Sequence, residues 1–122
     1  MKKKLYSLVA IILLVGCFSL TAHAAINASG RFTITVGAGE LRAASTGFPM
    51  AAWETVTINA TYSPASADVD FGLVDRNGIF YHLAGENGVF SKTIEIAESG
   101  TYIFAVRNNS NVSVAITGFV NY

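Results

Sequence analysis

The sequence is short of cysteine and of basic clusters, and each shortage argues against a class of protein. The only cysteine is Cys17, in an apolar N-terminal stretch. From residue 25 onward the chain has none, so that part can form no disulfide and can be neither a thiol enzyme nor a Cys-ligated zinc protein. It also carries eight Asp+Glu against five Lys+Arg. A nucleic-acid binder needs a basic face to neutralise phosphates, and this charge balance disfavours that class.

The first 24 residues have the three-part pattern of a secretory signal. Lys2–Lys4 form the positive region, Leu5–Gly16 is an uncharged and mostly apolar run, and Ala22 and Ala24 are the small residues of an A-x-A cleavage site. A membrane-spanning helix would need about 20 apolar residues, and this run is shorter. The pattern predicts cleavage after Ala24 and secretion of residues 25–122.

Cys17 allows a second interpretation of this leader. The sequence LVGC (Leu14–Cys17) resembles a bacterial lipoprotein box, in which the cysteine is acylated and becomes the new N-terminus. The residues that follow, FSLTAHA, are still fairly apolar, whereas a lipoprotein more often continues with polar spacer residues. We therefore favour cleavage after Ala24, with a lipid anchor at Cys17 on the outer face of the membrane as the alternative. The box also suggests that the protein is bacterial.

Apolar and polar residues alternate repeatedly in residues 25–122, which we expect to form a single domain. A period of two is typical of β-strands that bury one face. Turn signals such as DRNG, GENG, ESG and NNSN separate the last segments. Short strands at this spacing predict an all-β, antiparallel β-sandwich, jelly-roll or Ig-like, with about seven or eight strands. The seven alternating segments are RFTITV, ETVTINATY, DVDFGLVD, IFYHLA, FSKTIEI, TYIFAVRN and VSVAITGFVNY.

The segment Gly37–Ala52 fits no long strand and exceeds the length of a hairpin loop. It could cross between sheets, form a short helical turn at GELRAAS, or add an irregular edge strand. Trp53 follows it directly. Because a large aromatic side chain usually covers apolar area, we expect Trp53 to cover one end of the core rather than to offer a platform for a sugar.

Two stretches, SADVDFGLVDRNGIFY and IEIAESGTYIFAVRN, resemble the later strands of bacterial pre-peptidase C-terminal domains, and are also similar to Golgi-dynamics-type domains. The resemblance covers about Thr55–Tyr122. It implies a jelly-roll-like β-sandwich that acts as a non-catalytic accessory or interaction module. Most such domains are attached to an enzyme, and this chain carries none. The matching residues are Asp68, Asp70, Asp75, Gly78, Ser99, Gly100, Tyr102, Val106 and Asn108.

Side-chain oxygens that could bind calcium concentrate in Asp68, Asp70, Asp75 and Asn77. Calcium takes six to eight oxygen ligands, and Asp68 and Asp70 share one face of a strand because they are two residues apart. DRNG resembles a fragment of a calcium loop, but the later Glu at the required offset is missing. The alternative is an ordinary turn at Asp75 and Asn77, with the other two aspartates on a solvated face.

No set of residues supplies a nucleophile, a base and an orienting group together. After cleavage His82 is the only histidine, and no G-x-S-x-G motif accompanies it. We expect a buried or half-buried strand histidine there. Glu95 and Glu98 are three apart at a strand end, so they point to different faces and do not suggest a glycosidase pair. We expect no enzyme and, calcium aside, no cofactor.

The sequence therefore favours a secreted, non-catalytic extracellular module that binds a cell-surface, protein or glycan partner through sheet edges or loop tips. Trp53, Asn108 and Asn111 are candidate surface contacts. An aromatic carbohydrate platform is the alternative to core packing for the other large rings, which include Tyr62 and Tyr102. The alternative functions are an exported antibacterial or host-acting peptide toxin and a matrix protein that self-associates by edge pairing.

Overall fold

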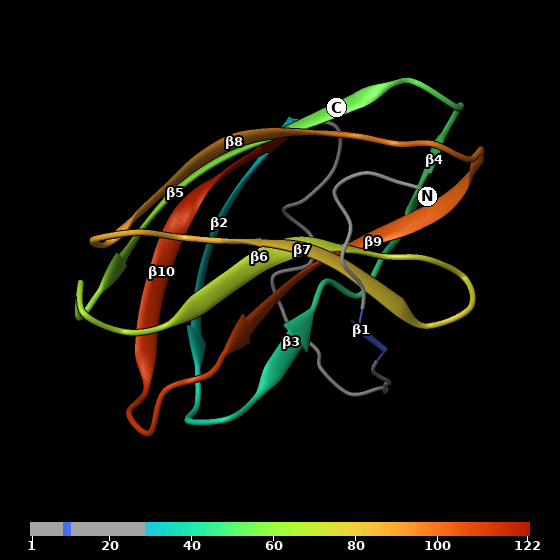
Figure 1. The fold of residues 1–122 in the computed structure, drawn as a ribbon. Helices are drawn as coiled ribbons and strands as arrows, with labels where there is room; N and C mark the ends of the chain where they lie inside the picture. Colours follow the sequence, from blue (N-terminus) through green and yellow to red (C-terminus); the bar gives the residue numbers. More distant parts are fainter. Residues whose placement is uncertain (1–8, 11–28) are drawn as a thin grey trace.

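Two antiparallel sheets pack face to face in the computed structural model, which describes residues 9–10 and 29–122 (Figure 1). The predicted all-β sandwich is confirmed. The expectations for Ala24 and Cys17 lie outside the described residues. The strands are β1 (Val9–Ala10), β2 (Ser29–Val36), β3 (Leu41–Ala43), β4 (Phe48–Met50), β5 (Thr55–Ser63), β6 (Val69–Val74), β7 (Ile79–Ala84), β8 (Val89–Glu95), β9 (Gly100–Asn108) and β10 (Val114–Asn121).

The strand order identifies the sandwich as a jelly roll. One sheet has the order β2–β10–β5–β8, and the other runs β1–β7–β6–β9, with β3 and β4 both pairing with the far side of β9. When β3 and β4 are taken as two halves of one broken strand, the first and last strands of the domain, β2 and β10, lie side by side. This is the double-sheet arrangement of a jelly roll. The described residues contain no helix long and apolar enough to cross a membrane.

The segment between β2 and β5 forms the irregular edge strand, one of the three alternatives that its sequence allowed. β4 pairs with the beginning of β9 and β3 with its end, and between them Ala44 N donates to Phe104 O at 2.9 Å. Each half has only three residues. A period of two cannot be recognised over so short a segment, and the alternation pattern therefore predicted two strands fewer here.

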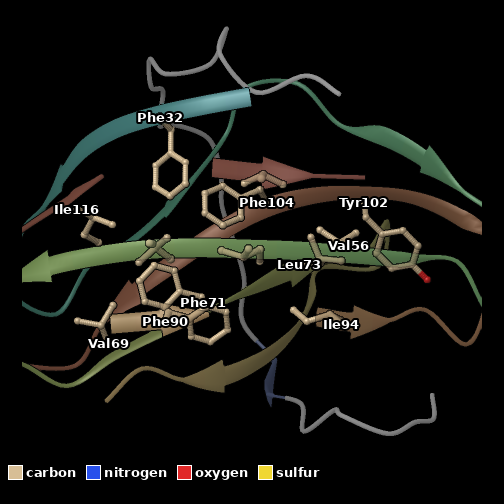
Figure 2. Close-up of a cluster of buried hydrophobic side chains, with 14 of the residues drawn as sticks. Phe32, Val56, Val69, Phe71, Leu73, Phe90, Ile94, Tyr102, Phe104 and Ile116 are labelled. Atoms are coloured by element: carbon tan, nitrogen blue, oxygen red, sulfur yellow. The ribbon is translucent and has the colours of Figure 1, made fainter. Parts of the chain in front are cut away.

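The core lies between the two sheets and is built from the apolar phase of each long strand (Figure 2). Aromatic rings from opposite sheets meet in it. Phe71 of β6 stacks on Phe90 of β8 with ring centroids 4.6 Å apart, and Phe32 of β2 lies 4.8 Å from Phe104 of β9. Such pairs add about 0.5–1.5 kcal/mol beyond the area they bury.

Two tight turns were predicted correctly. In the β7–β8 turn, Asn87 and Gly88 both have positive φ, and Glu86 and Val89 exchange two backbone hydrogen bonds of 2.9 and 3.0 Å. These are the features of a type I′ hairpin. In the β6–β7 turn, Asp75 Oδ1 accepts the N–H groups of Asn77 and Ile79 at 2.8 and 3.0 Å.

Candidate functional site

The loop between β4 and β5 is fixed by its own hydrogen bonds and by bonds to the β8–β9 segment. Ala51 N donates to Glu54 Oε1 at 2.8 Å, and Glu54 N donates back to Ala51 O at 3.1 Å. Ala52 N donates to Ser99 Oγ at 3.0 Å. Because each of these donors and acceptors is paired, the loop is held in one conformation between its two strands.

Trp53 occupies the centre of this loop in an unusual backbone conformation. Its φ is 74°, in the left-handed region that costs an L-residue about 1–2 kcal/mol. Two bonds hold it there: Trp53 N donates to Ile96 O at 2.6 Å, and Ile96 N donates to Glu54 O at 2.9 Å. The side chain is 64% exposed. The loop therefore presents a large aromatic ring to solvent on a strained, hydrogen-bonded backbone.

The expectation that Trp53 covers the end of the core is wrong. That end is closed by Phe48 and Met50 of β4, which are buried, and by Tyr122, whose ring stacks on Phe48 at a centroid distance of 3.8 Å. The backbone hydrogen bonds that Trp53 and Glu54 make with Ile96 tie this loop to the end of β8. The indole stays exposed instead of covering Phe48 and Met50.

Asp68 and Asp70 belong to a cross-strand polar cluster at the start of β6. Asp70, which is largely buried, accepts hydrogen bonds at Oδ2 from Arg107 Nη2 at 2.7 Å and from Asn109 Nδ2 at 2.8 Å. The Asn109 amide also lies 3.4 Å from Asp68 Oδ1. The charge of Asp70 is thus balanced by an arginine on the neighbouring strand.

Asp75 and Asn77, the other two predicted calcium ligands, lie at the opposite end of β6. The six residues of β6 separate the pairs by about 20 Å at 3.3 Å per residue. The four side chains therefore do not converge on one ion. Asp75 Oδ2 additionally accepts the hydroxyl of Tyr81 at 2.9 Å. In the described part of the chain, no group of three or more His, Cys, Asp or Glu side chains is arranged to hold a metal ion.

His82 is a half-buried strand histidine, as predicted. Its ring stacks on Phe80 with centroids 4.8 Å apart, and its Nε2 lies 3.2 Å from Arg107 Nη2. Burial and the adjacent guanidinium of Arg107 lower the pKa of His82 below its ordinary value of 6.5, although the carboxylate of Asp70 acts in the opposite direction. The geometry favours a neutral imidazole that packs within the sheet.

Asn108 is not a surface contact, and this prediction is wrong. The residue is fully buried, and its Nδ2 donates to the carbonyl oxygens of Val36 and Gly37, both at 3.1 Å, and of Val112 at 2.6 Å. Its Oδ1 accepts the N–H of Ser110 at 2.8 Å. Asn108 therefore organises the β9–β10 turn from inside. Asn111, at the tip of that turn, is exposed.

Core packing rather than a surface platform accounts for the buried tyrosines. Tyr62 and Tyr102 are both members of the core cluster, and Tyr102 donates its hydroxyl to Glu98 O at 2.7 Å. One exposed aromatic escaped the sequence reasoning: Phe119 of β10, which is 45% exposed. Its signal is in the sequence, because Phe119 falls on the polar phase of VSVAITGFVNY, with Ala115, Thr117 and Asn121.

No protein-family model matches the chain, and no curated protein matches it significantly.

Proposed function

We propose that the protein is a secreted, non-catalytic module that binds an extracellular or cell-surface partner through the loop that carries Trp53. The observation that carries the proposal is the exposed indole of Trp53 on a left-handed backbone that hydrogen bonds to Ile96 hold in place. Removal of the leader after Ala24 would release the domain from the membrane.

Two physical arguments support a contact role for this residue. A strained non-glycine residue persists only where the surrounding structure holds it, and such residues cluster at functional sites. Tryptophan is also enriched among the residues that dominate binding energy, because its large ring desolvates on contact. The hydrogen bonds of Glu54 and Ser99 already order the loop. Binding of a partner would therefore cost little conformational entropy in this loop.

The partners of Asp70, Arg107, Asp75 and His82 also support a non-catalytic role for these four groups. Asp70 and Arg107 pair with each other, and Asp75 accepts hydrogen bonds within its own turn. The His82 imidazole lies between Phe80, Asp70 and Arg107. These contacts assign the groups to the cohesion of the sheet.

Trp53 is the single tryptophan of the chain, so tryptophan fluorescence, excited where tyrosine does not absorb and corrected for the emission of the envelopes alone, reports on this loop. The exported protein should be titrated with washed envelopes of the producing cell, and binding followed in parallel by co-sedimentation. We expect a shift of the emission maximum on binding, and at least a tenfold loss of co-sedimentation for Trp53→Ala.

Val112→Ala is the matched control, because Val112 is also exposed but lies in the β9–β10 turn. It should bind as the wild type does. Unchanged emission together with equal retention of Trp53→Ala and the wild type would reject the proposal. Leakage of lipid vesicles at micromolar concentrations would favour the toxin alternative instead.

A further inference from the structure

The outer face of the sheet β2–β10–β5–β8 is lined by uncharged hydrogen-bonding side chains. The registers of these four strands place every second residue on this face, and nearly all of them are exposed. Eleven threonine, serine and asparagine residues lie there, with Arg31 and Glu95 as the only charged residues of the face. The opposite face of the same sheet supplies half of the core. We propose that this face, called here the hydroxyl face, binds a neutral polysaccharide.

An exposed aromatic ring lies in the middle of the hydroxyl face. The registers align Arg31, Phe119, Asn59 and Ser91 in one row across the four strands. The guanidinium of Arg31 lies over the Phe119 ring, with its carbon 4.7 Å from the ring centroid, so this long side chain has to move aside for a sugar to stack on that face. The aliphatic faces of sugar rings pack on such aromatic surfaces, while sugar hydroxyls need donors and acceptors at the edge of the ring. The row offers both kinds of contact side by side.

Cross-strand hydrogen bonds orient these polar groups before any ligand arrives. Ser91 Oγ donates to Asn59 Oδ1 at 2.6 Å, and the hydroxyl oxygens of Thr33 and Thr117 lie 3.2 Å apart in the next row. A similar pair, Thr57 and Thr93, lies 3.0 Å apart on the other side of Phe119. Ordered side chains lose less conformational entropy on binding. The groups therefore form a pre-arranged array rather than a set of independently mobile side chains.

The chemistry of the face disfavours other macromolecules. Nucleic acid would need a basic surface, and here Arg31 and Glu95 cancel in charge. Packing of a second copy, sheet on sheet, would need an apolar face with interdigitating side chains, whereas hydroxyls and amides dominate this one. Its width across four strands is about 14 Å at 4.8 Å per strand. An open surface of that extent is suited to a polymer of several sugar units.

Binding of the exported protein to microcrystalline cellulose, crystalline chitin and soluble starch tests this proposal by pull-down and affinity electrophoresis. We expect retention on at least one of them that persists in 0.5 M NaCl, where the screening length is about half that at physiological salt, because the contacts are uncharged. Phe119→Ala should weaken it at least tenfold. Since Phe119 is exposed, the melting temperature of this variant should stay close to that of the wild type.

Trp53→Ala and Val112→Ala serve as controls, because both residues lie in loops outside the hydroxyl face. Both variants should bind the polysaccharide normally, which separates this proposal from that of the Trp53 loop. The inference would be overturned if the protein bound none of the three polysaccharides. It would also be overturned by binding that high salt abolishes, or by binding that Trp53→Ala removes and Phe119→Ala leaves intact.

Discussion

The side-chain amide of Asn108 donates a hydrogen bond to the carbonyl oxygen of Val36 at 3.1 Å, and so joins the end of β9 in one sheet to the end of β2 in the other. The same nitrogen also reaches the carbonyls of Gly37 and Val112. Val36 is the last residue of β2, Gly37 follows it, and Val112 lies shortly before β10. One buried side-chain amide thus donates hydrogen bonds to backbone carbonyls in two turns, the one that follows β2 and the one that precedes β10.

Asn108→Ala should destabilise the domain by about 3 kcal/mol, because it leaves buried carbonyls without a donor and the Ser110 N–H without an acceptor. For a domain of this size that is a fall in melting temperature of about 10 °C or more. Thermal unfolding followed by circular dichroism measures it. The control is Asn111→Ala, an exposed change expected to stay within about 0.5 kcal/mol of the wild type. Equal melting temperatures for the two variants would contradict the buried role.

Gly72 is required by close packing of backbone against backbone. A Cβ atom at this position of β6 would lie 1.9 Å from the carbonyl oxygen of Tyr81 and 2.8 Å from Cα of His82 on the neighbouring strand. Gly72→Ala should therefore cost about 3 kcal/mol or more. At Gly100, where β9 begins, the nearest atom to a new Cβ would be 3.7 Å away, an ordinary contact. Gly100→Ala should be neutral or slightly stabilising, and urea denaturation of both variants compares them directly.

Long strands were predictable from the sequence because their alternation persists. β5, with nine residues, alternates in burial along nearly its whole length, and β10 does so as well. The three-residue strands β3 and β4 were not predictable, because their pairing is decided by β9, which lies about half a chain away. Local sequence carries no information on such a partner.

The candidate sites were predicted less well for a related reason. The tip NNSN presents three asparagines of equal local character, and only contacts with Val36 and Gly37 decide that Asn108 is the buried one. The exposure of Trp53 likewise depends on its hydrogen bond to Ile96 of a distant segment. Whether a particular polar side chain is buried, or a particular apolar one exposed, depends on its tertiary contacts. The residue type alone predicts only the average burial of that type.

His82 should make the domain less stable in mild acid. Its pKa is lowered in the folded protein from the ordinary value of 6.5, because burial and Arg107 together outweigh the opposite effect of Asp70. Between the two pKa values the unfolded chain binds more protons, so stability is complete above about pH 6.5 and falls as the pH drops towards the folded pKa. Below the folded pKa this contribution no longer changes.

The measurement is the free energy of unfolding of wild type and His82→Gln between pH 8 and pH 5. The glutamine variant removes the titrating group, so its stability should depend less on pH over the window just below 6.5. Parallel curves for the two proteins would show that His82 does not contribute. The comparison between the two proteins subtracts the pH dependence that they share.

Trp53 allows the backbone strain to be separated from the loss of the ring. Trp53→Ala and Trp53→Gly both remove the indole, but only glycine adopts a φ of 74° without steric penalty. After allowance for the greater freedom of glycine in the unfolded chain, Trp53→Gly should be more stable than Trp53→Ala by about 0.5–1 kcal/mol.

Both variants should lose envelope binding to the same extent. Because they lack the only tryptophan, unfolding in urea has to be followed by circular dichroism. A glycine variant more stable than the alanine variant, with equally weak binding, would show that the left-handed φ of position 53 costs stability to a residue with a Cβ, while the loss of binding comes from the indole. That result would support the proposed contact between the Trp53 side chain and a partner. If glycine and alanine gave equal stability, the loop would have relaxed around the smaller side chains, and the hydrogen bond to Ile96 would not be what holds the backbone in place.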